Sequence, residues 1–430
     1  MTNKSYRSLE IQITKSNKLW KSCDTICHNS SHLYNKINYL CRQKYFECGR
    51  IPDSKILYQQ IKDEPEWRLN GHKNISIQTL RNVINTWQSY FSARKSYNSG
   101  TAGFTGKPKI PGYKHRDSGR FATLYQTQST GSPISMTLLE KNTIRLLGNN
   151  KIQFAIPSHM NGKDVKIVNI VPNLNHYSII ITYEVEIMDT ISTSSKSAMD
   201  LGVNNLCAIT FSQPNKVPIL VNGRHIKSIN QYYNKKLAYL NSKLPQNVRT
   251  SKAIKTLTRK RNNKIKNELH QISKSITDLM KSNNVDELII GKNNGWKQNI
   301  NIGKKNNQKF VNIPYNKLIF QISYKLESVG IKTTTNEESY TSKASFLDLD
   351  FIPTYAKSET KYQFSGKRVR RGLYKSKSGH LINADINASY NIMRKVVPKV
   401  FDNGIEGVVV HPLTLNRSGI TSIKAAQISI

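Results

Sequence analysis

Acidic residues are scarce in this sequence: 27 Asp and Glu stand against 65 Lys and Arg among 430 residues, which gives a formal net charge of +38. So strong a positive charge recruits polyanions, and the release of counterions from phosphates would supply much of the binding affinity. A basic protein bound to a membrane surface is the alternative. We consider it the weaker one, because the basic residues are dispersed instead of lying on one amphipathic helix and no lipidation motif is present.

Long apolar runs are also missing. No run reaches the roughly 18 residues that are needed to span a bilayer. The segment Met1–Ser5 does not open like a signal peptide. We therefore expect a cytoplasmic protein with no membrane partner.

Cysteines are few. The chain has five, an odd number, and no two of them are spaced as a Cys-x-x-Cys pair. A disulfide framework and an ordinary zinc ribbon are therefore not supported. Cys23, Cys27, Cys41 and Cys48 lie in one stretch with helical spacing, where small buried apolar side chains are a better interpretation than a metal site.

The N-terminal part of the chain changes character twice. Apolar and aromatic residues recur at helical spacing over 17–98 and predict a helical bundle. Glycines, prolines, cations and aromatics over 100–120 predict a loop that could follow a nucleic-acid backbone. Short β-branched runs over 121–186 predict a small sheet or barrel. Because Ser8–Ile13 also alternates like a strand, the bundle would be an insertion into that β unit.

The C-terminal part alternates between strands and helices. A linker over 190–196 precedes a predicted β-hairpin at 197–211 and a strand near Val217. The next predicted elements are a long basic helical region at 229–283, a strand at 287–291, a helix at 314–329, a strand at 331–336 and a helix at 385–395. This order predicts an α+β multidomain chain whose C-terminal half is an RNase H-like α/β domain.

Three segments of the chain carry acids that could serve phosphodiester hydrolysis, which needs two Mg²⁺ about 3.5–4 Å apart. Asp200 lies in an apolar strand, where an acid is costly unless it binds a metal or a cation. Asp385 begins a helix, and there the simpler interpretation is a charge that complements the helix dipole. Glu337 and Glu338 end a strand, where a solvated strand end is the simpler interpretation. Spacing alone does not decide between these interpretations.

Taken together, several segments resemble TnpB, the nuclease of bacterial insertion sequences and the likely ancestor of type V CRISPR effectors. The resemblance spans most of the chain. The segments that carry it are 107–114, 200–206, 290–298, 306–314, 337–348, 364–374 and 383–392.

The resemblance implies a bacterial, nucleoid-associated protein that binds a guide RNA transcribed from its own transposon end, one protein for each RNA. It would cleave complementary double-stranded DNA beside a short flanking motif with two Mg²⁺, for which Mn²⁺ can substitute. The implied modules are the first strands of a β-rich wedge (1–16), a helical recognition module with the basic loop (17–115), the rest of the wedge (116–192), a RuvC nuclease domain (193–400) and a C-terminal tail (401–430).

Two departures from the family pattern stand out. Gly291 occupies the position at which the family usually carries its second catalytic Glu. Some family members carry a Glu on the following strand, just before a Thr-Ser motif, and the resemblance implies that Glu338 replaces the missing acid, with Glu337 as the alternative. Neighbouring strands lie about 4.8 Å apart, an offset that a Glu side chain can span. The predicted catalytic and metal-binding set is therefore Asp200, Glu338 and Asp385.

The second departure concerns the zinc ribbon, whose region would be 340–380. Ser345 stands where the first Cys would be and no Cys follows, so we predict no zinc. Asp348 and Asp350 are predicted to pair with the basic segment 367–371, which we call the lid.

Contacts to nucleic acid are expected from four groups of residues, although a solvated charged surface is the simpler interpretation of any one of them. An inactive RNA-guided DNA-binding repressor, suggested by Gly291, and a compact type V CRISPR effector are the alternative functions. The predicted contacts are Lys107, Lys109, Tyr113 and Lys114; Arg259, Lys260 and Arg261, with Lys264 and Lys266; Lys304 and Lys305, with Lys309; and Lys367, Arg368, Arg370 and Arg371.

Overall fold

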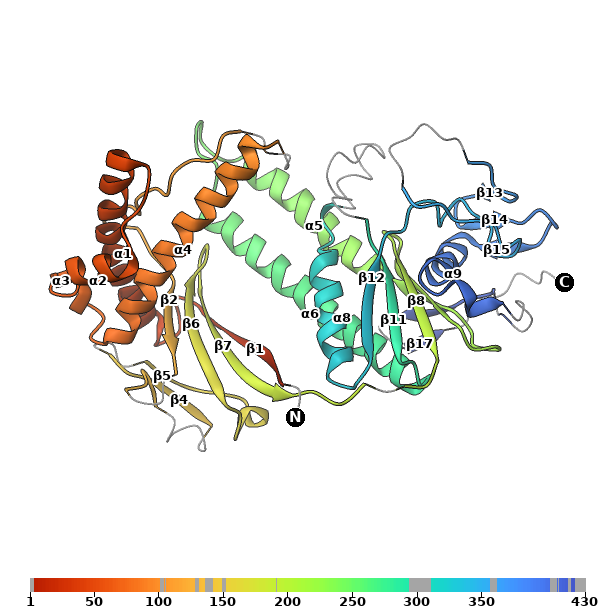
Figure 1. Cartoon of the computed structure of the whole chain (residues 1–430), viewed down its shortest axis with the longest axis horizontal. Helices are drawn as coiled ribbons and strands as arrows, with labels where there is room; N and C mark the ends of the chain where they lie inside the picture. Colours follow the sequence, from red (N-terminus) through yellow and green to blue (C-terminus); the bar gives the residue numbers. More distant parts are fainter. Residues whose placement is uncertain are drawn as a thin grey trace. The chain divides into compact units, whose positions relative to one another are not determined.

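The chain folds into two compact units, Lys4–Glu186 and Ile187–Ile430. Each unit has its own sheet and its own hydrophobic core (Figure 1). No helix among the described residues is long and apolar enough to cross a bilayer. The computed structural model describes residues 4–100, 104, 106–127, 131–135, 142–148, 152–190, 192–293, 311–355, 362–402, 408, 410–416 and 419–421.

The first unit is built on an antiparallel sheet with the strand order β1-β7-β6-β2. The first strand therefore pairs with the last strand of the unit, and the helices between them in the sequence are an insertion. A smaller antiparallel sheet is formed by β3, β4 and β5. The strands are β1 (Lys4–Ile13), β2 (Thr123–Gln126), β3 (Ile134–Ser135), β4 (Thr143–Leu146), β5 (Ile152–Ala155), β6 (Val165–Pro172) and β7 (Tyr177–Glu186).

The inserted helices pack around Trp87, which is fully buried and donates from Nε1 to Asn38 Oδ1 (2.9 Å). Of the four cysteines expected to be buried, three are buried in α1, but Cys48 at its last turn is exposed, so the expectation is wrong there. The helices are α1 (Trp20–Cys48), α2 (Ser54–Ile61), α3 (Pro65–Arg68) and α4 (Lys73–Asn98), and a 3₁₀ turn follows β5 at Ser158–Met160.

The second unit contains a seven-stranded sheet with the order β12-β11-β8-β9-β10-β16-β17. Strands β8 to β10 form an antiparallel meander, whereas β11 runs parallel to β8 and β12 parallel to β11. Parallel neighbours need a crossover connection, and the helices α5, α6 and α8 lie in these crossovers. The strands are β8 (Lys196–Leu201), β9 (Asn205–Phe211), β10 (Ile219–Asn222), β11 (Glu287–Gly291), β12 (Lys332–Asn336), β16 (Leu413–Asn416) and β17 (Gly419–Thr421).

Helices cover both faces of this sheet. The basic region that was predicted as one helical stretch forms two helices, because the connection between them contains Pro245, which lacks the N–H that a helix interior needs. The predicted C-terminal tail contributes β16, which pairs in parallel with β10. The helices are α5 (Arg224–Asn241), α6 (Lys252–Ser282), α8 (Tyr315–Glu327) and α9 (Ala384–Val396), followed by a 3₁₀ turn at Pro398–Phe401.

Alternation along the strands divides their side chains between the two faces. Met199 of β8 belongs to a core formed with α6 and α8, whereas Ala198 belongs to a second core that includes α9. Strand β11 divides in the same way, with Ile289 in the α9 core. Asp200 therefore lies on the α9 face with Ala198, and Gly291 lies on that face with Ile289.

Candidate active site

Asp385 is the second residue of α9, and its position is set by the start of that helix. Asn383 caps the helix, because its side-chain Oδ1 accepts from the N–H groups of Asp385 (3.0 Å) and Ile386 (3.3 Å). The carboxylate of Asp385 accepts from Asn205 Nδ2 at the beginning of β9 (2.8 Å). The cap and the amide together direct this carboxylate toward the strand pair that carries Asp200.

Glu338 follows β12 by two residues and is held by Asn293, which follows β11. The N–H of Glu338 donates to Asn293 Oδ1 (3.0 Å), and Asn293 Nδ2 lies 3.5 Å from Glu338 Oε1. The other carboxylate oxygen, Oε2, is buried and has no hydrogen-bond partner among the residues that the structure describes. An unpartnered, buried carboxylate oxygen is unfavourable unless a proton or a cation occupies the site.

Gly291 makes room for this carboxylate. A Cβ added at Gly291 would lie 2.8 Å from Glu338 Oε2 and 2.5 Å from Ile392 Cδ1 of α9. Both distances are shorter than any relaxed contact. The Glu338 carboxylate can therefore lie beside position 291 only because this position has no side chain.

Two of the predicted acids act electrostatically on the third, Asp200. Burial, and then the charges of Glu338 and Asp385, raise the pKa of Asp200 well above its usual range. Burial, and then the charge of Glu337, raise the pKa of Glu338 to about 7. The structure thus brings Asp200 into the field of both other acids.

The fit of these acids to Mg²⁺ rests on donor chemistry. Carboxylate oxygen is the protein donor that Mg²⁺ prefers, and Glu338 Oε2 is free to serve as one. Within the described part of the chain, no three acidic, His or Cys side chains form a compact metal-binding cluster. The acids therefore fit a divalent cation in charge and donor type, and binding would have to draw them closer together.

Glu337 has a different environment from its neighbour. It forms an ion pair with Lys395 of α9, which is only 9% exposed, and it accepts from the N–H of Ser339 (2.8 Å). Burial alone would raise the pKa of Glu337, but these hydrogen bonds outweigh burial and hold it below its usual value. Glu337 is therefore occupied within the protein, which favours Glu338 as the residue with a free oxygen.

A second group of acids lies in the region where the zinc ribbon was expected to be degenerate. Asp348 Oδ2 accepts from Ser345 Oγ (2.5 Å) and from the N–H of Lys377 (2.8 Å). Asp350 accepts from the N–H of Ser345 (2.8 Å) and from Ser365 Oγ (2.6 Å). We call these two aspartates and two serines the Asp-Ser knot.

The Asp-Ser knot corrects one prediction. Among the residues that the structure describes, neither Asp348 nor Asp350 forms an ion pair with the lid, and Ser345, Ser365 and backbone N–H groups donate to these carboxylates instead. These residues do not fit zinc, since the positions offer neither thiolate nor imidazole. The surrounding small sheet consists of β13 (Lys367–Arg370), β14 (Leu373–Lys375) and β15 (Leu381–Asn383).

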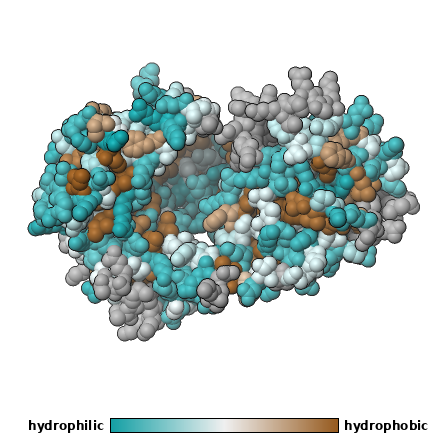
Figure 2. Space-filling model, viewed as in Figure 1, coloured by the Kyte–Doolittle hydropathy of each residue, from teal (hydrophilic) through white to brown (hydrophobic). Residues whose placement is uncertain are grey.

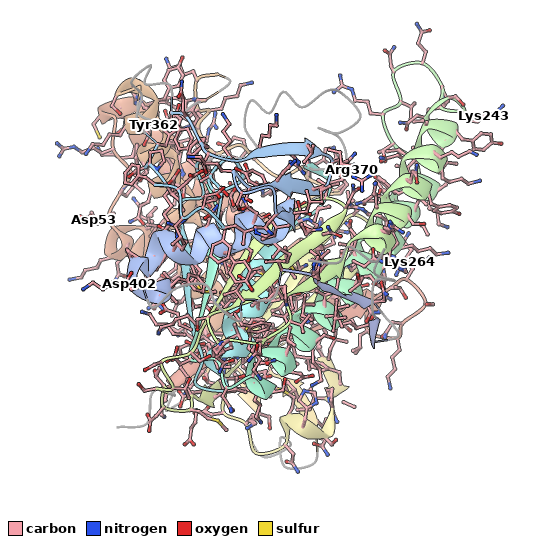
Figure 3. All side chains as sticks on the ribbon, turned by 90° about the vertical axis from the view of Figure 1, so that its right-hand side faces the viewer. Asp53, Lys243, Lys264, Tyr362, Arg370 and Asp402 are labelled. Atoms are coloured by element: carbon pink, nitrogen blue, oxygen red, sulfur yellow. The ribbon has the colours of Figure 1, made fainter. Side chains whose placement is uncertain are left out.

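The lid residues are exposed on β13 and in the turn after it. Arg368 lies closest to the acids, with Nη2 4.0 Å from Asp385 Oδ1. The predicted contacts Lys304 and Lys305, like Lys309, lie outside the described residues. Figure 3 labels Arg370, the last residue of β13.

The three consecutive cations of α6 have different roles. Lys260 is exposed. Arg261 donates to Asn230 Oδ1 (2.9 and 2.6 Å) and to Asn312 O (2.9 Å), so its guanidinium is engaged within the protein. Arg259 is partly buried, and its Nε has no hydrogen-bond partner within the described part of the chain.

In the first unit, the basic loop is tied to α1. Asn35 both donates to Lys114 O (2.9 Å) and accepts from its N–H (2.7 Å), and Lys114 Nζ lies 4.8 Å from the ring centroid of Tyr34. Tyr113 is half exposed, and Lys107 and Lys109 are exposed. This segment therefore presents its cations and one aromatic ring from a fixed backbone.

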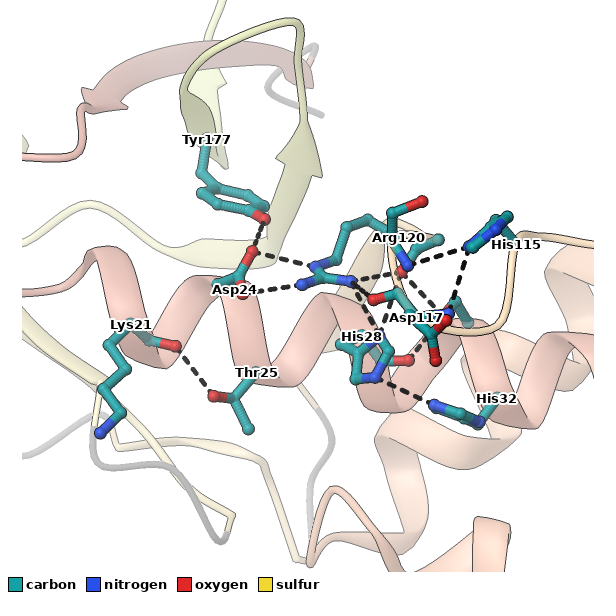
Figure 4. Close-up of polar contacts among 12 residues, drawn as sticks. Lys21, Asp24, Thr25, His28, His32, His115, Asp117, Arg120 and Tyr177 are labelled. Atoms are coloured by element: carbon teal, nitrogen blue, oxygen red, sulfur yellow. Dashed lines mark hydrogen bonds and ion pairs between the residues drawn. The ribbon is translucent and has the colours of Figure 1, made fainter.

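A polar network in the first unit was not predicted from the sequence (Figure 4). Arg120 donates to both carboxylate oxygens of Asp24 (2.9 and 2.8 Å), and Tyr177 donates to the same carboxylate (2.5 Å). Arg120 also reaches His28 Nδ1 (2.8 Å), whose ring contacts His32. The network joins α1 to β7. No sequence pattern signals it, because its members are far apart in the chain.

Two protein families match this chain. Residues 180–297 match OrfB_IS605, described as a probable transposase, and residues 315–392 match the TNB domain of Cas12f1-like proteins. A comparison with curated proteins gave no match. The matches begin at the end of β7 in the first unit, lie mostly in the second unit and include Asp200, Glu338 and Asp385.

Solved structures of similar fold include a Cas12f1–sgRNA–target DNA complex, 13% identical with a TM-score of 0.52, in which 87% of this chain matches 83% of that one. The mini RNA-guided endonuclease CRISPR-Cas_phi3 is 9% identical with a TM-score of 0.42, over 91% of this chain and 92% of that one. The fold is therefore of the mixed α+β class seen in the Cas12f1 structure. The family matches confirm the resemblance to TnpB that the sequence predicts.

Proposed function

We propose that the protein is an RNA-guided DNA endonuclease of a transposon. It binds a guide RNA derived from the transposon end, one protein for each RNA, and cleaves complementary double-stranded DNA beside a short flanking motif. The observation that carries this proposal is the buried, unpartnered Glu338 Oε2 beside Gly291, near Asp200. This free oxygen supports a cation-dependent site, whereas the family pattern alone would suggest that the second catalytic acid has been lost at Gly291.

The proposed roles follow from the positions of the acids. Asp200, Glu338 and Asp385 would hold two Mg²⁺, or Mn²⁺ in their place, in an RNase H-like (RuvC) domain. These ions supply a nucleophilic water and stabilise the leaving oxygen of the phosphodiester. Asn205 and Asn293 orient two of the carboxylates through the hydrogen bonds described above.

The nucleic-acid partners are inferred from charge and from the relatives. The Cas12f1 structure of similar fold is a complex with guide RNA and target DNA. The net charge of +38 suits the same polyanions. In this class of protein, base pairing with the guide reads the sequence, while the protein reads backbone shape and a short motif. We place the protein in the bacterial cytoplasm with the nucleoid.

The test uses the purified full chain with its bound RNA. Sequencing that RNA should return the transposon end, and a plasmid with a matching target should be cut with Mg²⁺ or Mn²⁺ and not with EDTA. Asp200→Ala should lose cutting and keep guided binding in a gel-shift assay. Cutting by that variant would overturn the assignment.

Two alternatives have specific support. Gly291 suggests an inactive, guided repressor, which would bind the target and leave it uncut under every metal condition. The match to a Cas12f1-like TNB domain suggests a compact type V CRISPR effector. A CRISPR effector would carry an RNA with a repeat-derived segment, so the same RNA sequencing experiment separates it from the transposon nuclease.

A further inference from the structure

Helices α5 and α6 line a groove of about 1060 Å³ in the second unit. Its apolar walls include Leu240, Leu257 and the rings of Tyr232 and Tyr233. Tyr232 is 64% exposed, so its ring is presented to solvent instead of being part of the core. Figure 2 shows that hydrophilic side chains dominate the viewed face, on which smaller apolar patches stand out.

The rest of the groove is basic. Lys236, Lys252, Lys260 and Lys264 line it, and none of its described lining residues is acidic. Figure 3 shows α5 and α6 side by side, with Lys264 along their length and Lys243 near their far end. The groove therefore favours an occupant that carries several negative charges.

Neighbouring side chains hold Tyr233, one residue of the groove wall, in place. The guanidinium of Arg261 lies 5.6 Å from the ring centroid of Tyr233, and the Tyr233 hydroxyl is 3.1 Å from Thr258 Oγ1. Arg261 is in turn fixed by Asn230 and by the carbonyl of Asn312. The Tyr233 side of the groove is therefore formed before any ligand binds, which lowers the entropic cost of binding.

We propose that this groove binds unpaired nucleotides, with a base stacked on Tyr232 and phosphates beside Lys236, Lys260 and Lys264. Unpaired nucleotides combine flat apolar faces with one negative charge each, and aromatic rings next to cations bind them with little sequence preference. A duplex hides its base faces and would leave the tyrosine unused. This inference rests on the proposed function, because a guided nuclease encounters unpaired RNA and unpaired DNA.

The test compares Tyr232→Ala with Tyr232→Phe in the full chain, freed of bound RNA by high salt. Fluorescence anisotropy would measure binding of an oligo-U RNA, an oligo-dT DNA and a duplex of equal length. Tyr232→Ala should weaken binding of a single strand by about 5- to 100-fold, Tyr232→Phe should leave it unchanged, and duplex binding should not change in either. The RNA and DNA arms show which strand the groove prefers.

Two further variants control this test. Phe320→Ala removes a ring that is 68% exposed on α8, outside the groove, and should have no effect on binding. Lys260→Gln should reduce the salt dependence of single-strand binding by about one unit of log–log slope.

Three results would overturn the inference. The first is an unchanged affinity of Tyr232→Ala for single strands. The second is an equal loss of affinity for single strands and for the duplex. The third is displacement of the oligonucleotide by an acidic peptide or by a second copy of the chain. If Tyr232→Ala binds single strands more weakly but the wild type does not cleave a guided target, the proposed function would be rejected and the assignment of the groove would stand.

Discussion

Asp348 and Asp350 accept hydrogen bonds from serine hydroxyls and backbone N–H groups, whereas Glu338 keeps one buried oxygen without any donor. The pKa values follow this contrast. Burial alone would raise the pKa of Asp348, but its hydrogen bonds hold it below its usual value, while burial and a neighbouring acid raise the pKa of Glu338 to about 7. Donors decide the ionisation of a partly buried acid. The Asp-Ser knot is complete without an ion, and the candidate active site is not.

The largest effect should come from exchanging one acid of the Glu337–Glu338 pair. Glu338→Gln replaces the carboxylate whose Oε2 has no hydrogen-bond partner among the described residues. DNA cleavage should fall by more than about 100-fold, because the loss of a residue that only supports a metal ligand already costs up to about 100-fold. Cleavage of a matched plasmid target in Mg²⁺ measures this loss. Guided binding by the same variant should remain.

Glu337→Gln is the matched control for that variant. It removes the ion pair with Lys395 and should lower the free energy of unfolding by roughly 1–2 kcal/mol, while cleavage stays within a few-fold of the wild type. A larger loss of cleavage in Glu337→Gln than in Glu338→Gln would exchange the proposed roles of the two acids.

Local sequence patterns predicted most of the strands and helices of the second unit. The alternation over 197–211 and the apolar run over 287–291 predicted β8, β9 and β11 correctly. The same reasoning did not find β16, because an alternation of only four residues is too short to predict a strand and its pairing partner β10 is distant in the sequence. Strand formation in such a segment depends on its partner and not on its own sequence.

The candidate site shows the same limit. The resemblance to TnpB, and not spacing, singled out the acids at positions 200, 338 and 385. It favoured Glu338 but left Glu337 as the alternative, since the partner that occupies Glu337, Lys395, lies 58 residues further along the chain. The Asp-Ser knot was also missed, because serine and aspartate occur in many turns and only the fold brings Ser365 to Asp350. Contacts made by folding, and not composition, distinguish the two groups of acids.

A second experiment alters the space at the candidate site instead of its charge. Gly291→Ala places a Cβ against Glu338 Oε2 and Ile392 Cδ1, so it should destabilise the second unit by about 1–3 kcal/mol. Cleavage should fall as well, because the Glu338 carboxylate must move. Thermal melting and the plasmid assay measure the two effects. Gly106→Ala, where an added Cβ meets nothing within 4 Å, should leave both unchanged.

The third experiment removes one charge from the Asp-Ser knot. Asp348→Asn replaces an accepting oxygen by a donor that faces Ser345 Oγ and the N–H of Lys377, so the free energy of unfolding should fall by about 1–3 kcal/mol. Asp278→Asn, in an exposed pair with Lys274, is the control and should cost less than about 1 kcal/mol. We expect zinc chelators to leave both melting temperatures unchanged, and a drop in the wild type on chelation would contradict the metal-free knot.

The smallest effect should be a dependence of stability on pH, with opposite signs for the two groups of acids. The folded chain holds a proton on Glu338 up to about pH 7, above the ordinary value near 4.5, so this group favours folding at low pH and loses that contribution as the pH rises through this window. The pKa of Asp348 is lowered, so its ionised form stabilises the fold at pH values above the ordinary pKa of Asp. That stabilisation is lost as the pH falls through the lowered pKa. In EDTA, the melting temperature of the wild type minus that of Glu338→Gln should therefore decline between pH 4.5 and 7. Added Mg²⁺ should reverse the decline, because an ion replaces the proton. If the difference between the two melting temperatures does not change with pH in EDTA or in Mg²⁺, Glu338 binds neither a proton nor the ion.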